Sequence, residues 1–181
     1  MTEMGTRRTD GFTLIELLIV VALIGVLAGI AVPALMRARQ SGNESSAISS
    51  LRTISSAQYM YGTSCGNGFF AASLTVLGTA PPGGTPFIGP DLGAAATVAK
   101  GSYSVTIGSS TGADPVSPSS CNGQAAGTGT VGYWATATPT PGAGTDAYGT
   151  NTNATIYRAP QQTPLAMTDN TAPAGAVPIP R

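Results

Sequence analysis

The residues with the clearest chemical potential are one carboxylate and a peptide bond just before it. Glu16 lies near the start of an apolar stretch that runs from Phe12 to Met36. A carboxylate in a membrane helix costs on the order of 3 kcal/mol at mid-helix, and less near an end, so it requires a partner. The best partner is a new cationic α-amine on Phe12, which forms only if the bond between Gly11 and Phe12 is cleaved. We therefore expect proteolytic processing followed by charge pairing.

A long helix must position this carboxylate. The stretch from Leu17 to Met36 contains no charged residue and, at about 20 residues, is long enough to cross the hydrocarbon core of a membrane. We predict one helix from about Phe12 to Gly62, with a kink at Pro33, because proline removes a backbone hydrogen bond and clashes with the preceding turn. Beyond the apolar stretch, spacings of three and four predict one buried helical stripe made of Ala47, Ile48, Leu51, Ile54, Gln58 and Tyr61.

The remainder of the chain has the pattern of a small sheet with many loops. Residues 103–107, 131–138 and 155–157 alternate in the manner of strands, and residues 69–77 predict a short helix or strand. We predict an antiparallel sheet of three or four strands packed on the outer half of the long helix, which is an α+β fold. From Pro160 onward the chain is rich in proline and poor in large apolar residues, which predicts a disordered tail.

The composition argues against an enzyme and against nucleic-acid binding. Eight basic and eight acidic residues cancel in a chain of 181 residues, so no basic patch is available to neutralise phosphates. Histidine is absent, which removes the commonest general base and the commonest metal ligand. The letter matches G-x-S-x-G at 62–66 and G-x-G-x-x-G at 127–132 lack the strand and helix context that these motifs require. We therefore predict no catalytic residue, no cofactor and no nucleic-acid partner.

The two cysteines, Cys65 and Cys121, have no metal-ligand spacing, and no histidine is present to complete a zinc site. If the soluble part is exported, a disulfide is favoured over two free thiols. Closing a loop of about 55 residues would stabilise the fold by about 4 kcal/mol in the chain-entropy model.

The segment Gly11-Phe12-Thr13-Leu14-Ile15-Glu16-Leu17 resembles the processing site of type IV prepilins and of the related pseudopilins of type II secretion. The resemblance implies a pilin-like fold. It also implies that Gly11 is the last leader residue, that Phe12 becomes the N-methylated terminus, and that Glu16 is the assembly residue. The family's kink-forming proline is similar in position to Pro33. The resemblance is specific over residues 11 to about 40.

The resemblance also implies an organisation and a set of partners. The expected segments are a leader at 1–11, a transmembrane half-helix at 12–36, an amphipathic half-helix at 37–62, a loop-rich β-sheet head at 63–159 and the tail at 160–181. The expected partners are copies of the same chain, joined through their N-terminal helices, a prepilin peptidase that also methylates, an inner-membrane assembly platform with its ATPase, and membrane lipid before assembly. The subunit is expected in the inner membrane as a single-pass protein before assembly, and in a periplasmic or extracellular filament afterwards.

Several alternatives remain open. The chain is also compatible with a pseudopilin of a type II secretion system, or with a membrane-anchored enzyme or binding protein that keeps an uncut signal anchor. Glu16 has a structural interpretation as well, because Thr13-x-x-Glu16 fits the capping box at a helix start. We predict no metal site, although some secretion pseudopilins hold calcium in their sheet loops, and Asp146 is the residue here that would take part in such a site.

Overall fold

The computed structural model describes residues 11–141, 146–160 and 165–180. They divide into two units, residues 11–39 and residues 40–180, which are described separately. Helix α1, Leu14–Ser64, begins and ends slightly later than predicted and contributes to both units. Of the expected leader at 1–11, only Gly11 lies within the described residues.

In the described residues of the head (40–141, 146–160 and 165–180), a single sheet and two short helices accompany the second half of α1. The strands are β1 Thr97–Lys100, β2 Tyr103–Gly108, β3 Trp134–Pro139, β4 Asp146–Asn151, β5 Ile156–Pro160 and β6 Val177–Ile179, and the short helices are α2 Leu74–Gly78 and α3 Pro90–Gly93. Each strand pairs antiparallel with the next one along the chain, in the order β1-β2-β3-β4-β5-β6. The predicted α+β class is confirmed.

The sheet is larger than the three or four strands predicted. Strands β2, β3 and β5 match predicted segments, whereas β1, β4 and β6 were not predicted. The sequence of β4 contains Asp146, Gly149 and Asn151, which are residue types depleted in strands. Strand β6 contains Pro178, which cannot donate to a ladder and is tolerated because β6 lies at the edge of the sheet.

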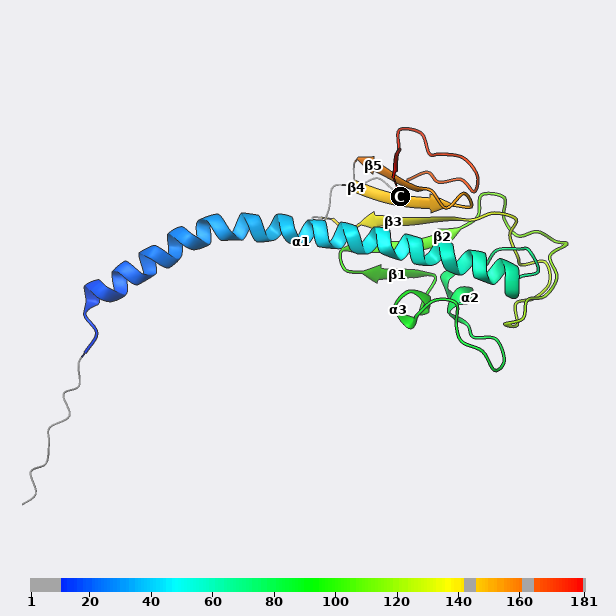
Figure 1. Ribbon diagram of the computed structural model, residues 1–181, viewed down its shortest axis with the longest axis horizontal. Helices are drawn as coiled ribbons and strands as arrows, with labels where there is room; N and C mark the ends of the chain where they lie inside the picture. Colours follow the sequence, from blue (N-terminus) through cyan, green and yellow to red (C-terminus); the bar gives the residue numbers. More distant parts are fainter. Residues whose placement is uncertain (1–10, 142–145, 161–164, 181) are drawn as a thin grey trace, which may run out of the picture. The chain divides into compact units, whose positions relative to one another are not determined.

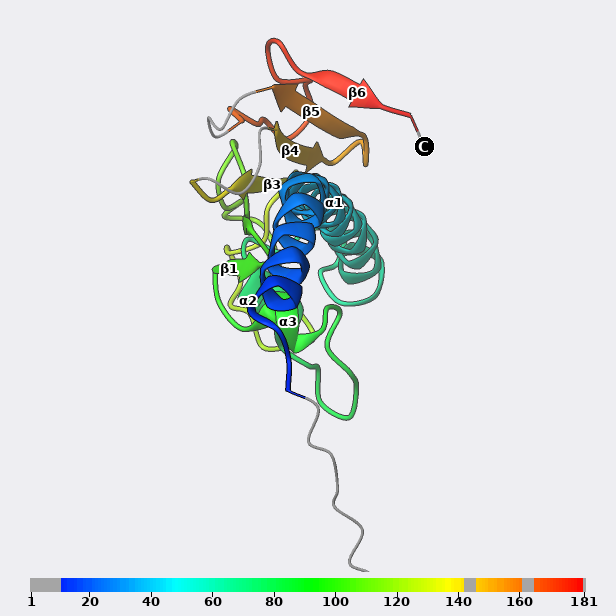
Figure 2. The same cartoon turned by 90° about the vertical axis from the view of Figure 1, so that its left-hand side faces the viewer.

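One face of the sheet packs against the second half of α1. The helix buries residues at spacings of three and four, which confirms five of the six residues of the predicted stripe; the sixth, Ile48, is partly buried against the core. The buried residues are Ala47, Ser50, Leu51, Ile54, Ala57, Gln58, Tyr61 and Gly62. From the sheet, β2 contributes Tyr103, Val105 and Ile107, and β3 contributes Ala135 and Ala137 to the same core. Figures 1 and 2 show this half of α1 running along the strands on one side of the sheet.

The opposite face of the sheet is covered by the C-terminal segment, which corrects the prediction of a disordered tail over 160–181. In the described part of that tail, Leu165, Met167 and Asp169 are buried and alternate with exposed residues. Leu165 and Met167 join a second apolar cluster with Ala147 and Tyr157 of the sheet. The composition of the tail predicted disorder, but a central sheet with two apolar faces requires a cover on both, and this segment provides the second.

Two glycines allow the C-terminal segment to lie close to the sheet. A Cβ atom on Gly149 would come within 2.7 Å of the Met167 sulfur, and one on Gly132 would come within 2.7 Å of the Asp169 Cβ. Both distances are far shorter than van der Waals contact. Larger residues at these two positions would therefore push the segment away from the strands.

Asp169 fixes the C-terminal segment to the loop that follows β2. One carboxylate oxygen, Oδ1, accepts the Ser110 N–H at 2.9 Å. The other, Oδ2, accepts the Ser109 hydroxyl at 2.8 Å, and the Thr111 N–H and hydroxyl at 3.2 and 2.9 Å. Burial acts to raise the pKa of the Asp169 carboxyl, but these hydrogen bonds outweigh it and the pKa is lowered. We call this group of contacts the Asp169 clasp.

Replacing Asp169 by alanine is expected to destabilise the head by about 3 kcal/mol at pH 7, because the N–H groups of Ser110 and Thr111 lose a charged acceptor. The folded pKa lies below the unfolded value, so the unfolded chain takes up the proton first. The clasp therefore stabilises the native state above about pH 4, and its contribution is lost as the pH falls through the folded pKa. Urea unfolding between pH 7 and pH 3 measures both effects.

The control for this prediction is Asp91→Ala. Asp91 forms an ion pair with Lys100 at 2.6 Å on the surface, where solvent screens the attraction, so its loss should change the free energy of unfolding little. If the Asp169 and Asp91 variants unfold alike at pH 7, the clasp does not carry the stability assigned to it.

A buried glutamine joins α1 to the chain segment that follows it. The Gln58 side chain donates from Nε2 to the Ala71 carbonyl at 2.8 Å and accepts the Ala71 N–H at Oε1, at 2.9 Å. Gln58 is fully buried, so both of its polar atoms, and the peptide groups of Ala71, depend on this pair of bonds. The amide therefore sets the position of the chain after the helix by contacting only its backbone.

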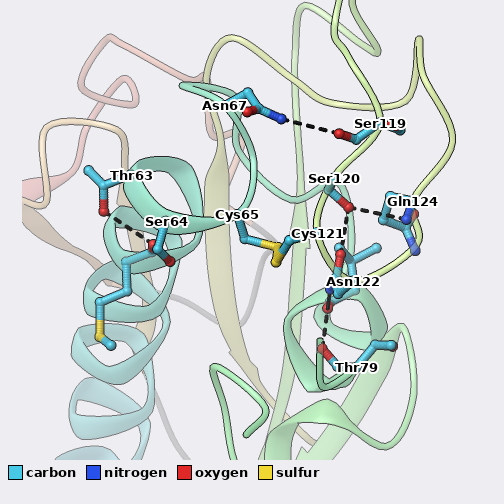
Figure 3. The surroundings of a disulfide bond; sticks show 12 residues. Thr63, Ser64, Cys65, Asn67, Thr79, Ser119, Ser120, Cys121, Asn122 and Gln124 are labelled. Carbon is cyan, nitrogen blue, oxygen red and sulfur yellow. Dashed lines mark hydrogen bonds between the residues drawn. A yellow bond between two sulfur atoms is a disulfide. The ribbon is translucent and has the colours of Figure 1, made fainter. Parts of the chain in front are cut away.

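The disulfide between Cys65 and Cys121 joins the end of α1 to the long connection between β2 and β3. Figure 3 shows that further polar contacts surround it. The Cys121 N–H donates to the Cys65 carbonyl at 3.1 Å, and Asn67 donates to the Ser119 carbonyl at 3.1 Å. Asn122 donates to the carbonyls of Val76 and Thr79 at 2.8 and 3.2 Å, which adds α2 to the same junction.

Candidate functional site

The candidate site is the N-terminal segment, from Gly11 to the first turn of α1. Gly11, Phe12 and Thr13 precede the helix and are exposed, and no atom of the described residues lies within 4 Å of where a Cβ on Gly11 would be. The Phe12 side chain is 80% exposed. Among the described residues, nothing covers the bond between Gly11 and Phe12, so a peptidase can approach it from several directions.

The start of α1 places the Glu16 carboxylate beside Thr13. The Thr13 hydroxyl accepts the Glu16 N–H at 3.3 Å and lies 3.4 Å from Glu16 Oε2, to which it can donate. Thr13 is thus the N-cap residue, and half of the capping box forms as that interpretation predicts. Within the described residues, the second oxygen, Oε1, has no hydrogen-bond partner. A carboxylate with a free oxygen at a helix N-terminus can accept an additional cation.

The side chains that follow form an apolar surface that the described chain itself does not cover. All described residues from 11 to 39 are exposed. The large apolar ones are Phe12, Leu14, Ile15, Leu17, Leu18, Ile19, Val20, Val21, Leu23, Ile24, Val26, Leu27, Ile30, Val32, Leu35 and Met36. A continuous apolar surface of this size is stable only in lipid or against other chains. The helix is long and apolar enough to cross a membrane, a test that a secretory signal sequence also passes.

The other residues singled out from the sequence lie elsewhere in the fold. Pro33 lies inside α1, and the bend expected there stays a prediction. Cys65 and Cys121 are joined in the head. Asp146 faces Arg158 across a distance of 3.4 Å. Among the described residues, no three His, Cys, Asp or Glu groups gather where they could hold a metal ion.

Sequence reasoning gave no role to Asp169. Its partners, Ser109, Ser110 and Thr111, are about 60 residues away along the chain. No local pattern signals such a contact, whereas the Thr13–Glu16 cap lies within one helical turn and is visible in the sequence.

Comparison with known families identifies one match, to the "Prokaryotic N-terminal methylation motif", over residues 6–32. This range includes Gly11, Phe12 and Glu16, the residues that form the candidate site. The match covers the start of α1 and does not extend to the head.

Curated relatives include subunits of two kinds of machinery. The chain is 47% identical over 51 residues to the type IV major pilin protein PilA of Myxococcus xanthus, which is 28% of this chain and 23% of that protein. It is 44% identical over 55 residues to the type IV wide pilus major component PilA4 of Thermus thermophilus, 30% of this chain and 42% of that one. It is 36% identical over 58 residues to the type II secretion system core protein G of Aeromonas hydrophila, 32% and 41% of the two chains.

The matched part of this chain thus spans less than half the length of each of these relatives. No solved structure matches the chain. The family model matches only the N-terminal methylation segment, and each curated match covers about a third of the chain. The head must therefore be interpreted from its own structure.

Proposed function

We propose that this chain, which carries the prokaryotic N-terminal methylation motif, is a structural subunit of a type IV pilus-like filament. A prepilin peptidase cleaves after Gly11 and methylates Phe12, and the mature subunits then assemble through α1. The observation that carries the proposal is the coincidence of three features: the methylation motif, an exposed Gly11–Phe12 bond, and a helix whose apolar side chains find no cover in the described chain.

The physical mechanism assigns a role to each part of the segment. Before assembly, the apolar part of α1 lies in the inner membrane, where lipid covers it. After cleavage, the Phe12 amine carries a positive charge, and methylation keeps it cationic at neutral pH. In the filament this amine neutralises Glu16 of a neighbouring subunit inside an apolar helix bundle, where an unpaired carboxylate would be costly. The uncut chain has no amine at this place, so cleavage precedes polymerisation.

A second candidate function is supported by the similarity to type II secretion core protein G. A pseudopilin would use the same cleavage, the same methylated Phe12 and the same Glu16 contact, but its filament would stay in the periplasm and act as a piston. The genes that adjoin this one distinguish the two. A retraction ATPase gene favours a pilus, whereas secretin and secretion ATPase genes favour the secretion pseudopilin.

The proposal is tested by the mass of the N-terminal peptide of the mature protein, isolated from cells that contain the cognate peptidase. The expected peptide begins with N-methylated Phe12. A peptide that begins with Met1, or with a residue near Ala31, contradicts the proposal, because it indicates an uncut anchor or a conventional signal sequence. A strain that lacks the peptidase serves as the control and should yield only the uncut precursor.

A further inference from the structure

Four of the eight charged residues of the described head form ion pairs with one another. Its cations are Arg52, Lys100 and Arg158. Lys100 pairs with Asp91 at 2.6 Å and Arg158 with Asp146 at 3.4 Å. Among the described residues, Arg52 has no carboxylate within 4.0 Å, although it lies on the exposed side of α1. An exposed arginine with a free guanidinium can form a bidentate contact with a carboxylate of another molecule.

Apart from Asp169, two acids of the described head have no cation within 4.0 Å of their carboxylates, Glu44 and Asp114. Asp169 is saturated by the clasp, and Asp91 and Asp146 have their cations. Glu44 is half-buried near Tyr148. Burial of the Tyr148 hydroxyl raises its pKa to about 12, and the negative charge of Glu44 is the second cause of this increase. Asp114, in the connection between β2 and β3, is also half-buried and without a cation among the described residues, and the exposed side chain of Val116 lies two residues away.

Arg52 lies in a groove along α1. Three adjoining cavities of about 380, 500 and 360 Å³ follow this side of the helix. The first and second share Ile179, and the second and third share Ser55, Ser56 and Ala154, so the three cavities lie in a row beside the helix. The helical residues that line them are Ile48, Arg52, Ser55, Ser56, Tyr59 and Met60, which span about 18 Å of helix. We call this row of cavities the α1 groove.

The far end of the α1 groove is apolar. Tyr59 and Met60 are 70% and 57% exposed, and Phe70 and Tyr133 line the same cavity. Aromatic residues, methionine and arginine are the types that are enriched at protein interfaces. The α1 groove therefore combines apolar side chains with one cation, Arg52, that has no ion partner among the described residues.

Asp114 belongs to a hydrogen-bonded turn whose carboxylate carries the charge opposite to that of Arg52. Its Oδ1 accepts the Val116 N–H at 2.9 Å, and its carbonyl accepts the N–H and hydroxyl of Ser117 at 3.1 and 2.8 Å. The Asp114 N–H donates to the Gly129 carbonyl at 2.8 Å, and Pro115 restricts the backbone in between. Val116 is 78% exposed, more than any other large apolar residue of the head. This Asp114 turn presents a carboxylate and an apolar side chain together, already ordered.

We propose that the Asp114 turn of one subunit docks into the α1 groove of the next, with Asp114 on Arg52 and Val116 on the apolar floor formed by Tyr59 and Met60. The inference rests on the proposed function, which requires contacts between copies. The two surfaces differ and lie on the same chain, so the contact is heterologous. Such a contact leaves one free groove and one free turn at the two ends of any assembly, as a growing filament requires.

The first test compares two alanine variants of the full chain that lose the same charge. Arg52→Ala should raise the subunit concentration needed for filament formation about tenfold, as expected for an interfacial charge pair worth ~1.4 kcal/mol. Lys100→Ala should leave it unchanged, because the partner of Lys100 lies in its own subunit. The charge swaps Arg52→Glu and Asp114→Arg should each impair assembly, and the double swap should restore part of it, because Asp114→Arg also removes the acceptor of the Val116 N–H.

The second test detects the contact without disturbing either charge. Cells express two copies of the chain together, one with Ser56→Cys and the other with Val116→Cys, and filaments are treated with a short bifunctional maleimide. A dimer that joins positions 56 and 116 is expected. The control pair, Ser56→Cys with Ala166→Cys, should give none, because Ala166 is exposed but lies outside both surfaces.

The outcomes separate this inference from the proposed function. If filaments with methylated Phe12 form, but Arg52→Ala behaves like Lys100→Ala and the 56–116 dimer is absent, the docking inference is wrong and the proposed function stands. If no filament forms and the N-terminus is uncut, both are wrong. The 56–116 dimer, together with rescue by the double swap, supports both.

Discussion

Replacing Glu16 by alanine is expected to abolish filament assembly while membrane insertion remains normal. Insertion depends on the apolar length of α1, and removal of a charge from that stretch makes insertion easier. In the proposed filament, assembly depends on the contact between the Glu16 carboxylate and the methylated amine of a neighbour, and without it each buried amine would lose its counterion. Truncating one partner of a buried charge pair costs about 2–5 kcal/mol per contact, and a filament repeats that loss at every subunit. Sedimentation of sheared filaments and membrane fractionation measure the two properties separately.

Two further variants separate charge pairing from helix capping at this position. Glu16→Gln keeps a hydrogen-bonding side chain near Thr13 but removes the charge, so it should fail to assemble. Thr13→Ala removes the N-cap hydroxyl, which typically costs a helix about 1 kcal/mol, but it keeps the carboxylate and should still assemble. Normal filaments from Glu16→Gln, or a complete defect in Thr13→Ala, would mean that Glu16 acts through the cap.

Loss of the disulfide is expected to destabilise the head by about 4 kcal/mol, the value for closing a loop of this length in the chain-entropy model. The bond joins the end of α1 to the connection between β2 and β3, which contains no strand. Its loss therefore loosens this connection in the folded protein, in addition to increasing the conformational freedom of the unfolded chain. The double variant Cys65→Ser/Cys121→Ser should unfold at a lower urea concentration than the oxidised protein.

Reduction of the wild-type protein is the matched comparison for this prediction. The reduced protein and the double serine variant both lack the cross-link and should both be less stable than the oxidised protein, the variant slightly more so because it places a hydroxyl at the buried position 65. Equal stability of the oxidised and reduced wild type would show that the polar contacts of Asn67 and Asn122 hold the junction by themselves.

The parts of the fold that the sequence predicts well are those with a strong local pattern. Helix α1 follows from a long apolar stretch and from one stripe at helical spacing, and the candidate site follows from adjacent residues, Gly11 and Phe12, and a cap one turn long. Strands β4 and β6 were missed because Gly149 and Pro178 are unfavourable in strands and are accepted here only through their neighbours.

Contacts between distant residues explain the remaining differences. The C-terminal segment has the composition of a disordered tail, yet it is ordered by Leu165 and Met167 on the sheet and by Asp169 on a distant loop. The charges at the proposed docking surfaces also have no distinguishing pattern in the sequence. Arg52 and Asp114 can be distinguished from the other charged residues only after the structure shows which of those are paired.

The Gln58–Ala71 contact has a consequence for how the head tolerates substitution. Gln58 binds only the peptide group of residue 71, and Asn67, Asn122 and Asn151 likewise donate to carbonyl oxygens of other segments. A backbone acceptor persists when the side chain that it carries is exchanged. The head can therefore accept exchanges at these acceptor positions, Ala71 among them, and keep the contacts that join its segments.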